Sequence, residues 1–215
     1  MSARRQAPRH VAWLLALLAG GLDAQAVLPP VDEAAAQPDF FSFRAQLATA
    51  VARRDAAAVF EAVDDHVKTG FGGDDGRAAF ERQWQPERPD SRLWETLGAV
   101  LALGGSFSGE HQFSAPYVYS RWPEHLDAFG HVAVIGSDVR LRAAPRADAP
   151  VIGRTSFGVL TLAGPATDAG WFEVRLPDGR SGHVARALAR SPLDYRAIFE
   201  RRDGRWRLVS LVAGD

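Results

Sequence analysis

The sequence has no cysteine in its 215 residues. This absence excludes disulfide bonds, thiolate nucleophiles and cysteine-ligated zinc, so the packing of apolar side chains must stabilise the fold. The G-x-S-x-G motif of serine hydrolases and the G-K-[ST] ending of phosphate-binding loops are also absent. We therefore predict no catalytic residue and no cofactor, and the sequence leans away from an enzyme.

An excess of charge of one sign is lacking too. Lysine and arginine number 25, aspartate and glutamate number 26, and the net charge is −1. Proteins that bind nucleic acid through phosphate contacts carry an excess of basic side chains. The charge balance therefore predicts no nucleic-acid partner.

Long apolar runs are missing except near the start, where residues 11–21 read VAWLLALLAGG. Arginines precede this run, and Ala24-Gln25-Ala26 follows it. A basic start, a short apolar stretch and an A-x-A site are typical of a secretory signal peptide. We predict that residues 1–26 are this signal, and that the mature protein is periplasmic or secreted and has no transmembrane segment. A membrane anchor that is not cleaved is the alternative.

The first half of the mature chain is predicted to be helical. Residues 27–39, rich in proline and alanine, are expected to form a flexible leader. Apolar residues at intervals of three and four then predict amphipathic helices. These helices are expected at about 43–51, 56–68, 77–84 and 91–103, with Asp55 as the cap of the second. We assign residues 40–130 to an N-terminal helical or α+β domain.

The second half is predicted to be mostly β-structure. Residues 115–122, APYVYSRW, predict a strand, and short β-type runs alternate with turn residues after it. Asp-Gly pairs at 178–179 and 203–204 indicate hairpin turns. The sequence therefore predicts an α+β protein with a small all-β barrel at 131–190 and a C-terminal β-hairpin at 191–215. The hairpin is expected to pack either on the barrel or on the N-terminal domain.

The segment 131–190 resembles the bacterial SH3-like domain family. The resemblance rests on short pieces in the order V-x-V-R-x-x-P, V-I-G, G, W-x-x-V and G-x-x-G-W-V. These pieces are Val139-Arg140-Leu141-Arg142, Ala144-Pro145, Val151-Ile152-Gly153, Gly158, Gly170-Trp171-Phe172-Glu173-Val174, Gly179 and Gly182-His183-Val184. The resemblance implies a small barrel that binds a ligand rather than catalyses a reaction.

The resemblance also implies a location in the cell envelope and contact with peptidoglycan or with an envelope protein. Arg140, Arg142, Trp171 and His183 lie within its motifs and are the expected ligand-binding residues. Arg140 stands where the family often has asparagine, and His183 stands where it often has an aromatic residue, which leaves the ligand open. The expected function is that of a secreted, non-enzymatic binding or scaffolding protein of the bacterial envelope.

Three aromatic residues before this segment, Tyr117, Tyr119 and Trp122, are further candidates for ligand binding. Aromatic side chains bury a large surface and supply stacking surfaces for ligands. Packing in a core or between the two domains is the alternative role of these residues.

A second, fainter similarity concerns residues 40–105, most clearly 52–84, which are similar to the opening helices of ketosteroid-isomerase-like α+β folds. The C-terminal stretch YRAIFERRDGRWRLVSL would supply the closing strands of such a fold. The SH3-like segment would then be an insertion. This arrangement implies the alternative function, a small-ligand binder or an enzyme with a pocket in a cone-shaped N-terminal domain.

Histidines and acidic residues, the residue types that bind metals, are scattered, and no two histidines have the spacing of a helical metal site. They are Asp65, His66, His111, His125, Asp127 and His131. The stretch FGGDDGRAAFERQW (71–84) fails as a calcium loop, because only Asp75 falls on a ligand position when Gly76 is the obligatory glycine. We predict no metal and interpret this stretch as a turn in which Asp74 or Asp75 caps the next helix.

Overall fold

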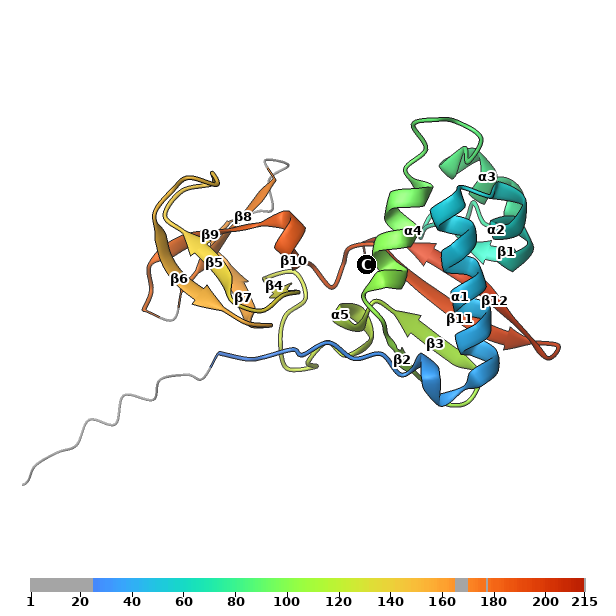
Figure 1. Ribbon diagram of the computed structural model, residues 1–215, viewed down its shortest axis with the longest axis horizontal. Helices are drawn as coiled ribbons and strands as arrows, with labels where there is room; N and C mark the ends of the chain where they lie inside the picture. The colour runs from blue at the N-terminus through green and yellow to red at the C-terminus, as the bar shows by residue number, and fades with distance from the viewer. Residues whose placement is uncertain (1–24, 165–169, 177, 215) are drawn as a thin grey trace, which may run out of the picture.

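The computed structural model describes residues 25–164, 170–176 and 178–214, so most of the predicted signal peptide lies outside the described residues. Figure 1 shows a larger half made of helices and a sheet, and a smaller half made of a second sheet. The predicted α+β class is confirmed, with five α-helices and twelve strands among the described residues. None of those helices has the length and apolar character needed to cross a membrane.

The larger half packs four helices against one sheet. Its helices are α1 (Pro38–Arg53), α2 (Ala56–Ala62), α3 (Arg77–Trp84) and α4 (Leu93–Ala102). Phe40 and Leu47 of α1 and Leu93 and Leu97 of α4 enter the same core, because residues four or seven apart share one side of a helix. The Asp55 side chain caps α2 as expected, accepting a hydrogen bond from a first-turn N–H at 3.0 Å.

The sheet of this half has five strands in the order β1-β12-β11-β3-β2. The strands are β1 (Val63–Lys68), β2 (Ser106–Phe107), β3 (Gln112–Ala115), β11 (Arg196–Arg202) and β12 (Arg205–Val212). The C-terminal hairpin β11–β12 is central, with β3 antiparallel on one side and β1 parallel on the other. The hairpin therefore packs with the N-terminal helices, and residues 131–190 belong to an insertion between β3 and β11.

Two local predictions are wrong for identifiable reasons. The helix expected at 56–68 ends at Ala62, because the β-branched Val63 and Val67 belong to β1, which pairs with β12. The strand expected at 115–122 ends at Ala115 and is followed by α5 (Tyr117–Ser120). Pro116 lacks the N–H that a continuing ladder would require.

The turn at 71–84 is present, but its helix cap differs from the prediction. The N-cap of α3 is Gly76, which has no capping side chain. Asp75 instead accepts from the Thr69 N–H at 3.2 Å, and Asp74 forms an ion pair with Arg82 at 2.9 Å. The two aspartates thus stabilise the loop itself.

The inserted half is a sheet of seven strands in the order β10-β4-β7-β8-β9-β5-β6. They are β4 (His131–Val134), β5 (Val139–Arg142), β6 (Val151–Thr155), β7 (Val159–Leu162), β8 (Trp171–Arg175), β9 (Ser181–Ala185) and β10 (Ala189–Arg190). Alternate side chains form a separate apolar cluster around Leu141, Phe172 and Val184. The predicted barrel is not closed, because the end strands β10 and β6 do not pair with each other among the described residues.

Residues 27–34, which belong to the flexible leader expected at 27–39, run along both halves, and we call them the strap. At the inserted sheet, Val27 bridges Gly158, and the Leu28 N–H donates to the Phe157 carbonyl at 2.8 Å. The Leu28 side chain is buried in the junction between the halves. This apolar contact explains why a proline- and alanine-rich segment has a defined path.

The other end of the strap is bound to the larger half. The Gly105 N–H donates to the Val31 carbonyl, and the Glu33 N–H donates to the Gly105 carbonyl, both at 3.0 Å. Asp32 accepts two hydrogen bonds from the Arg44 guanidinium, each 2.7 Å long. The strap is thus hydrogen bonded to both halves (Figure 1).

Candidate functional site

Three of the predicted binding residues meet on one face of the inserted sheet. Strand register places His183 of β9 opposite Arg142 of β5 on one side and opposite Glu173 of β8 on the other. Trp171 lies on the same face as Glu173, because side chains two residues apart along a strand point the same way. We call Arg142, His183, Glu173 and Trp171 the outer row.

The outer row offers both hydrogen-bond donors and acceptors. The Arg142 Nη1 donates to the Ala149 carbonyl at 2.7 Å, which orients the guanidinium. His183 is half-buried, and its Nδ1 has no hydrogen-bond partner among the described residues. The Glu173 carboxylate is exposed. A guanidinium, an imidazole and a carboxylate on neighbouring strands can bind the amides and carboxylates of a peptide.

Arg140 extends the positive charge of this face. It lies two residues before Arg142 and is directly opposite Arg154 of β6. Arg154 forms an ion pair with Asp138, whereas Arg140 is exposed and forms no ion pair with any described residue. All four predicted binding residues of the SH3-like segment therefore contribute to one surface.

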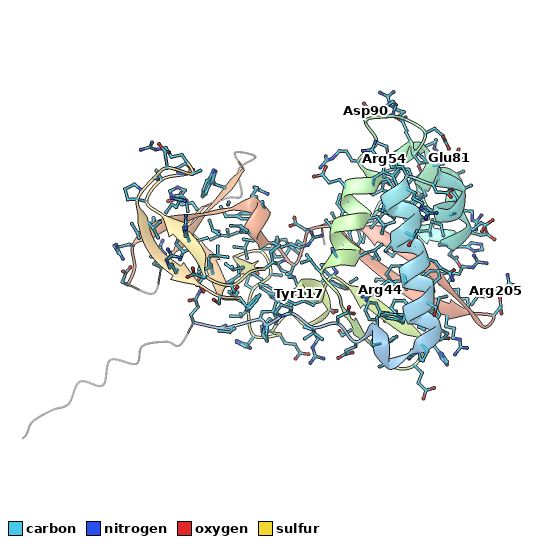
Figure 2. All side chains as sticks on the ribbon, viewed as in Figure 1. Arg44, Arg54, Glu81, Asp90, Tyr117 and Arg205 are labelled. Atoms are coloured by element: carbon cyan, nitrogen blue, oxygen red, sulfur yellow. The ribbon has the colours of Figure 1, made fainter. Side chains whose placement is uncertain are left out.

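The three aromatic candidates do not extend this surface. Tyr117 is only 1% exposed and lies between the two halves, where it packs in a cluster with Leu28 (Figure 2). Trp122 packs against the same cluster and donates Nε1 to the Leu126 carbonyl at 2.9 Å. The Tyr119 ring lies 4.7 Å from the Arg196 guanidinium. Packing between domains, the alternative from the sequence, describes Tyr117 and Trp122.

The junction contains ionisable groups shifted by burial. Burial raises the pKa of the Tyr117 phenol, whose hydroxyl has no hydrogen-bond partner among the described residues. In the connection to β11, burial lowers the pKa of the Arg190 guanidinium, and the charge of Asp194 opposes this effect. Arg190 donates to the Tyr195 carbonyl at 2.5 Å, which holds the connection in place.

Comparisons with family models, curated proteins and solved structures found no match. The SH3-like and isomerase-like similarities therefore stay predictions.

The alternative function needs a pocket inside the larger half, and aromatic rings fill that space. Phe40, Phe113 and Phe199 are fully buried on the helix-covered face of the sheet. The ring centroid of Phe40 lies 4.3 Å from that of Phe113 and 5.7 Å from that of Phe199. Rings at these separations are in contact, so this core is solid where a cone-shaped fold would hold its ligand.

A surface cleft of about 710 Å³ lies between α1, α2 and the β11–β12 turn. Its Asp39 carboxylate accepts from the Trp206 Nε1 at 3.2 Å and forms an ion pair with Arg201 at 3.3 Å. The Glu61 backbone carbonyl accepts from Arg207. The Asp39 carboxylate of this cleft is therefore already paired within the protein.

The scattered histidines and acidic residues do not converge on a metal position. Within the described parts of the chain, no three histidine or carboxylate side chains are arranged to hold an ion. His125 and His131 do line one pocket, together with Thr161 and Arg175. Sequence reasoning missed this pocket. Alternation assigns Thr161 and Arg175 each to a face of its own strand, but only the register of β7 with β8 brings the two residues together.

Proposed function

We propose that this protein is a secreted, non-enzymatic binding or scaffolding protein of the bacterial cell envelope. In this proposal the outer row of the inserted sheet contacts peptidoglycan or an envelope protein. The observation that carries the proposal is the alignment of Arg142, His183 and Glu173 on three adjacent strands. Paired residues on neighbouring strands have Cβ atoms about 5 Å apart, which matches the spacing of polar groups along a peptide.

The form of the surface also favours a large ligand. Small ligands usually bind in concave sites that bury most of their surface. The outer row lies on a sheet face, where an extended polymer can contact several strands at once. Trp171 adds an aromatic surface on which a sugar or a peptide group can stack. Peptidoglycan presents sugars, amides and carboxylates together, and it is therefore the first partner to test.

The larger half supports a scaffolding role rather than a catalytic one. Its core is filled by aromatic rings, and the carboxylate of Asp39 in its surface cleft is paired with Trp206 and Arg201. A domain with a filled core is rigid, and its outer surface is available for contacts with other molecules. It would position the inserted sheet in the envelope.

The test is sedimentation of the mature chain with purified peptidoglycan at low salt. We expect the protein to be retained, and we expect His183→Ala to weaken retention with little change in stability, because the imidazole forms no hydrogen bond to any described residue. Arg142→Gln should weaken retention about tenfold, the value of one charge-assisted contact. Arg205→Gln is the matched control, since Arg205 is exposed and lies far from the inserted sheet (Figure 2).

Trp171→Ala separates a folding role from a contact role. Trp171 is half-buried at the start of β8, so its removal should lower the thermal stability of the protein, whereas His183→Ala should not. Thermal unfolding of each variant measures this difference. If the wild-type protein is retained neither by peptidoglycan nor by envelope proteins at low salt, the proposed function is wrong.

A further inference from the structure

A second site lies where the strap meets the inserted sheet. This pocket has a volume of about 410 Å³, and we call it the junction pocket. Gln25 and Ala26 form one wall, Val159 is part of the apolar lining, and Thr161 and Arg175 add polar groups. None of the described residues that line the junction pocket is acidic.

Residues 25 and 26 complete the hydrogen bonding of β7 at this pocket. The Val159 N–H donates to the Ala26 carbonyl at 2.7 Å, and the Val159 carbonyl accepts from the Gln25 side-chain amide at 3.4 Å. Strand β8 pairs with β7 at Thr161 and ends at Arg175. Residues 25 and 26 therefore continue the ladder where β8 has ended.

The expected signal cleavage would remove these two residues. The A-x-A site ends at Ala26, so cleavage after it leaves Val27 as the new amino end. The strap would stay in place, because Leu28 is 6% exposed and its N–H is bonded to the Phe157 carbonyl. The N–H and C=O of Val159, which line the junction pocket, would lose the partners that residues 26 and 25 supply. A buried main-chain group without a partner is unfavourable and favours an incoming ligand.

The charges around the vacated position are positive. Cleavage creates an α-ammonium group on Val27, next to Gly158. Arg175 is exposed and forms no ion pair with any described residue. A carboxylate beside the former position of the Ala26 carbonyl, displaced enough to clear the Val27 nitrogen, would accept from the Val159 N–H and lie close to the new α-ammonium. Capture of a peptide carboxyl end by backbone donors and nearby cations is a recurring mode of recognition.

We propose that the processed protein binds the carboxyl end of a short peptide in the junction pocket, where the peptide takes the place of residues 25 and 26. The last residue of the bound peptide should have a small side chain, because alanine occupies the corresponding position in the unprocessed protein. The inference rests on the secretion that is part of the proposed function. Peptides of this kind arise in the envelope from two sources: signal fragments end in L-alanine, and cell-wall stem peptides end in D-alanine.

The experiment compares two forms of the protein, one that begins at Val27 and one that retains Gln25 and Ala26. Each is titrated with L-Ala-L-Ala and with D-Ala-D-Ala, and the amide signal of Val159 is followed by NMR. We expect the Val27 form to bind at least one dipeptide. The longer form should bind the dipeptide at least about tenfold more weakly, because its own residues 25 and 26 occupy the place of the ligand. A tenfold change in affinity corresponds to the loss of one charge-assisted hydrogen bond. Tighter binding of L-Ala-L-Ala indicates signal fragments as the source of the peptide, and tighter binding of D-Ala-D-Ala indicates the cell wall. Equal binding of the two dipeptides means that the pocket does not distinguish the enantiomers.

Two controls assign the binding to the junction pocket. The amide Ala-Ala-NH₂, which lacks the carboxylate, and the variant Arg175→Gln should each lower the affinity by about tenfold or more. Arg205→Gln, a change at another exposed arginine without an ion pair to any described residue, should leave it unchanged. Equal affinity of the two protein forms, or of the acid and the amide, overturns the proposal. The two proposals are tested separately, because the dipeptide titration follows Val159 in the junction pocket, whereas His183→Ala and Arg142→Gln change the outer row.

Discussion

Leu28→Ala tests whether the strap holds the two halves together. Leu28 is 6% exposed and packs in the junction cluster with Tyr117, Val118, Ala133 and Val159. Tyr117 and Val118 belong to α5, whereas Ala133 and Val159 belong to the inserted sheet. Because α5 packs beside β3 of the larger half, this cluster joins the two halves, and truncation of Leu28 should weaken the contact between them.

The expected loss of stability follows from burial. Transfer of the lost apolar groups from the junction to water contributes about 2.4 kcal/mol, at about 0.8 kcal/mol per buried carbon. A cavity adds to this loss if the strap cannot collapse, and the main-chain hydrogen bond of Leu28 to Phe157 limits such movement. We therefore expect a loss of about 3 kcal/mol, within the range of measured Leu-to-Ala changes.

Urea unfolding, followed by circular dichroism and by tryptophan fluorescence, measures this effect. A loss of about 3 kcal/mol should lower the urea midpoint by roughly 1 to 2 M for a protein of this size. Val27→Ala is the matched control, because Val27 is adjacent but 59% exposed, and its change should stay within about 0.5 kcal/mol. A loss below about 1 kcal/mol for Leu28→Ala would refute the role assigned to the strap.

Three further changes test other parts of the structure. Gly105→Ala would place a Cβ 2.2 Å from the Ser114 carbonyl oxygen, so it should cost at least about 2 kcal/mol in urea unfolding. Tyr117→Phe removes a buried hydroxyl without a described partner and should leave stability at pH 8 unchanged or higher by up to about 1 kcal/mol. Burial raises the pKa of Tyr117 in the folded state, so the unfolded chain releases the phenol proton at a lower pH than the folded chain does. The stability of the wild-type protein should therefore fall above about pH 10. Urea unfolding at pH 8 and pH 11 should show a smaller fall in stability for Tyr117→Phe than for the wild-type protein. Replacing residues 121–194 by a short linker, which leaves α5 and Tyr195 in place, should leave the larger half folded. Circular dichroism and a cooperative urea transition can check this.

Local signals in the sequence predicted local structure well. The capping role of Asp55 and the turn at Asp203-Gly204 depend on a few adjacent residues, and Gly204 adopts the positive φ of 75° that such a turn requires. The spacing of Val63 and Val67 was ambiguous, since it fits a helix but also places both residues on one face of a strand. Only pairing with β12, far along the chain, decides between these structures.

The candidate site was predictable only in part. The residues of β5, β8 and β9 could be assigned to faces by alternation, and the SH3-like motifs pointed to Arg142, Trp171 and His183. The register that places His183 between Arg142 and Glu173 depends on how three strands align, which alternation alone does not fix. The junction pocket was invisible for a similar reason, because its walls come from segments far apart in the sequence.

The geometry of the insertion explains why the larger half tolerates it. Ala115 at the end of β3 pairs with Ala197 near the start of β11, and antiparallel partners have Cα atoms about 5 Å apart. The inserted half therefore replaces the loop of a β-hairpin and leaves the sheet register intact. Two covalent connections at one edge would form a hinge. The strap adds a third connection, because it is hydrogen bonded to Gly105 on the larger half and to Phe157 on the inserted sheet. This connection restrains rotation about the hinge. It therefore fixes the direction in which the outer row faces.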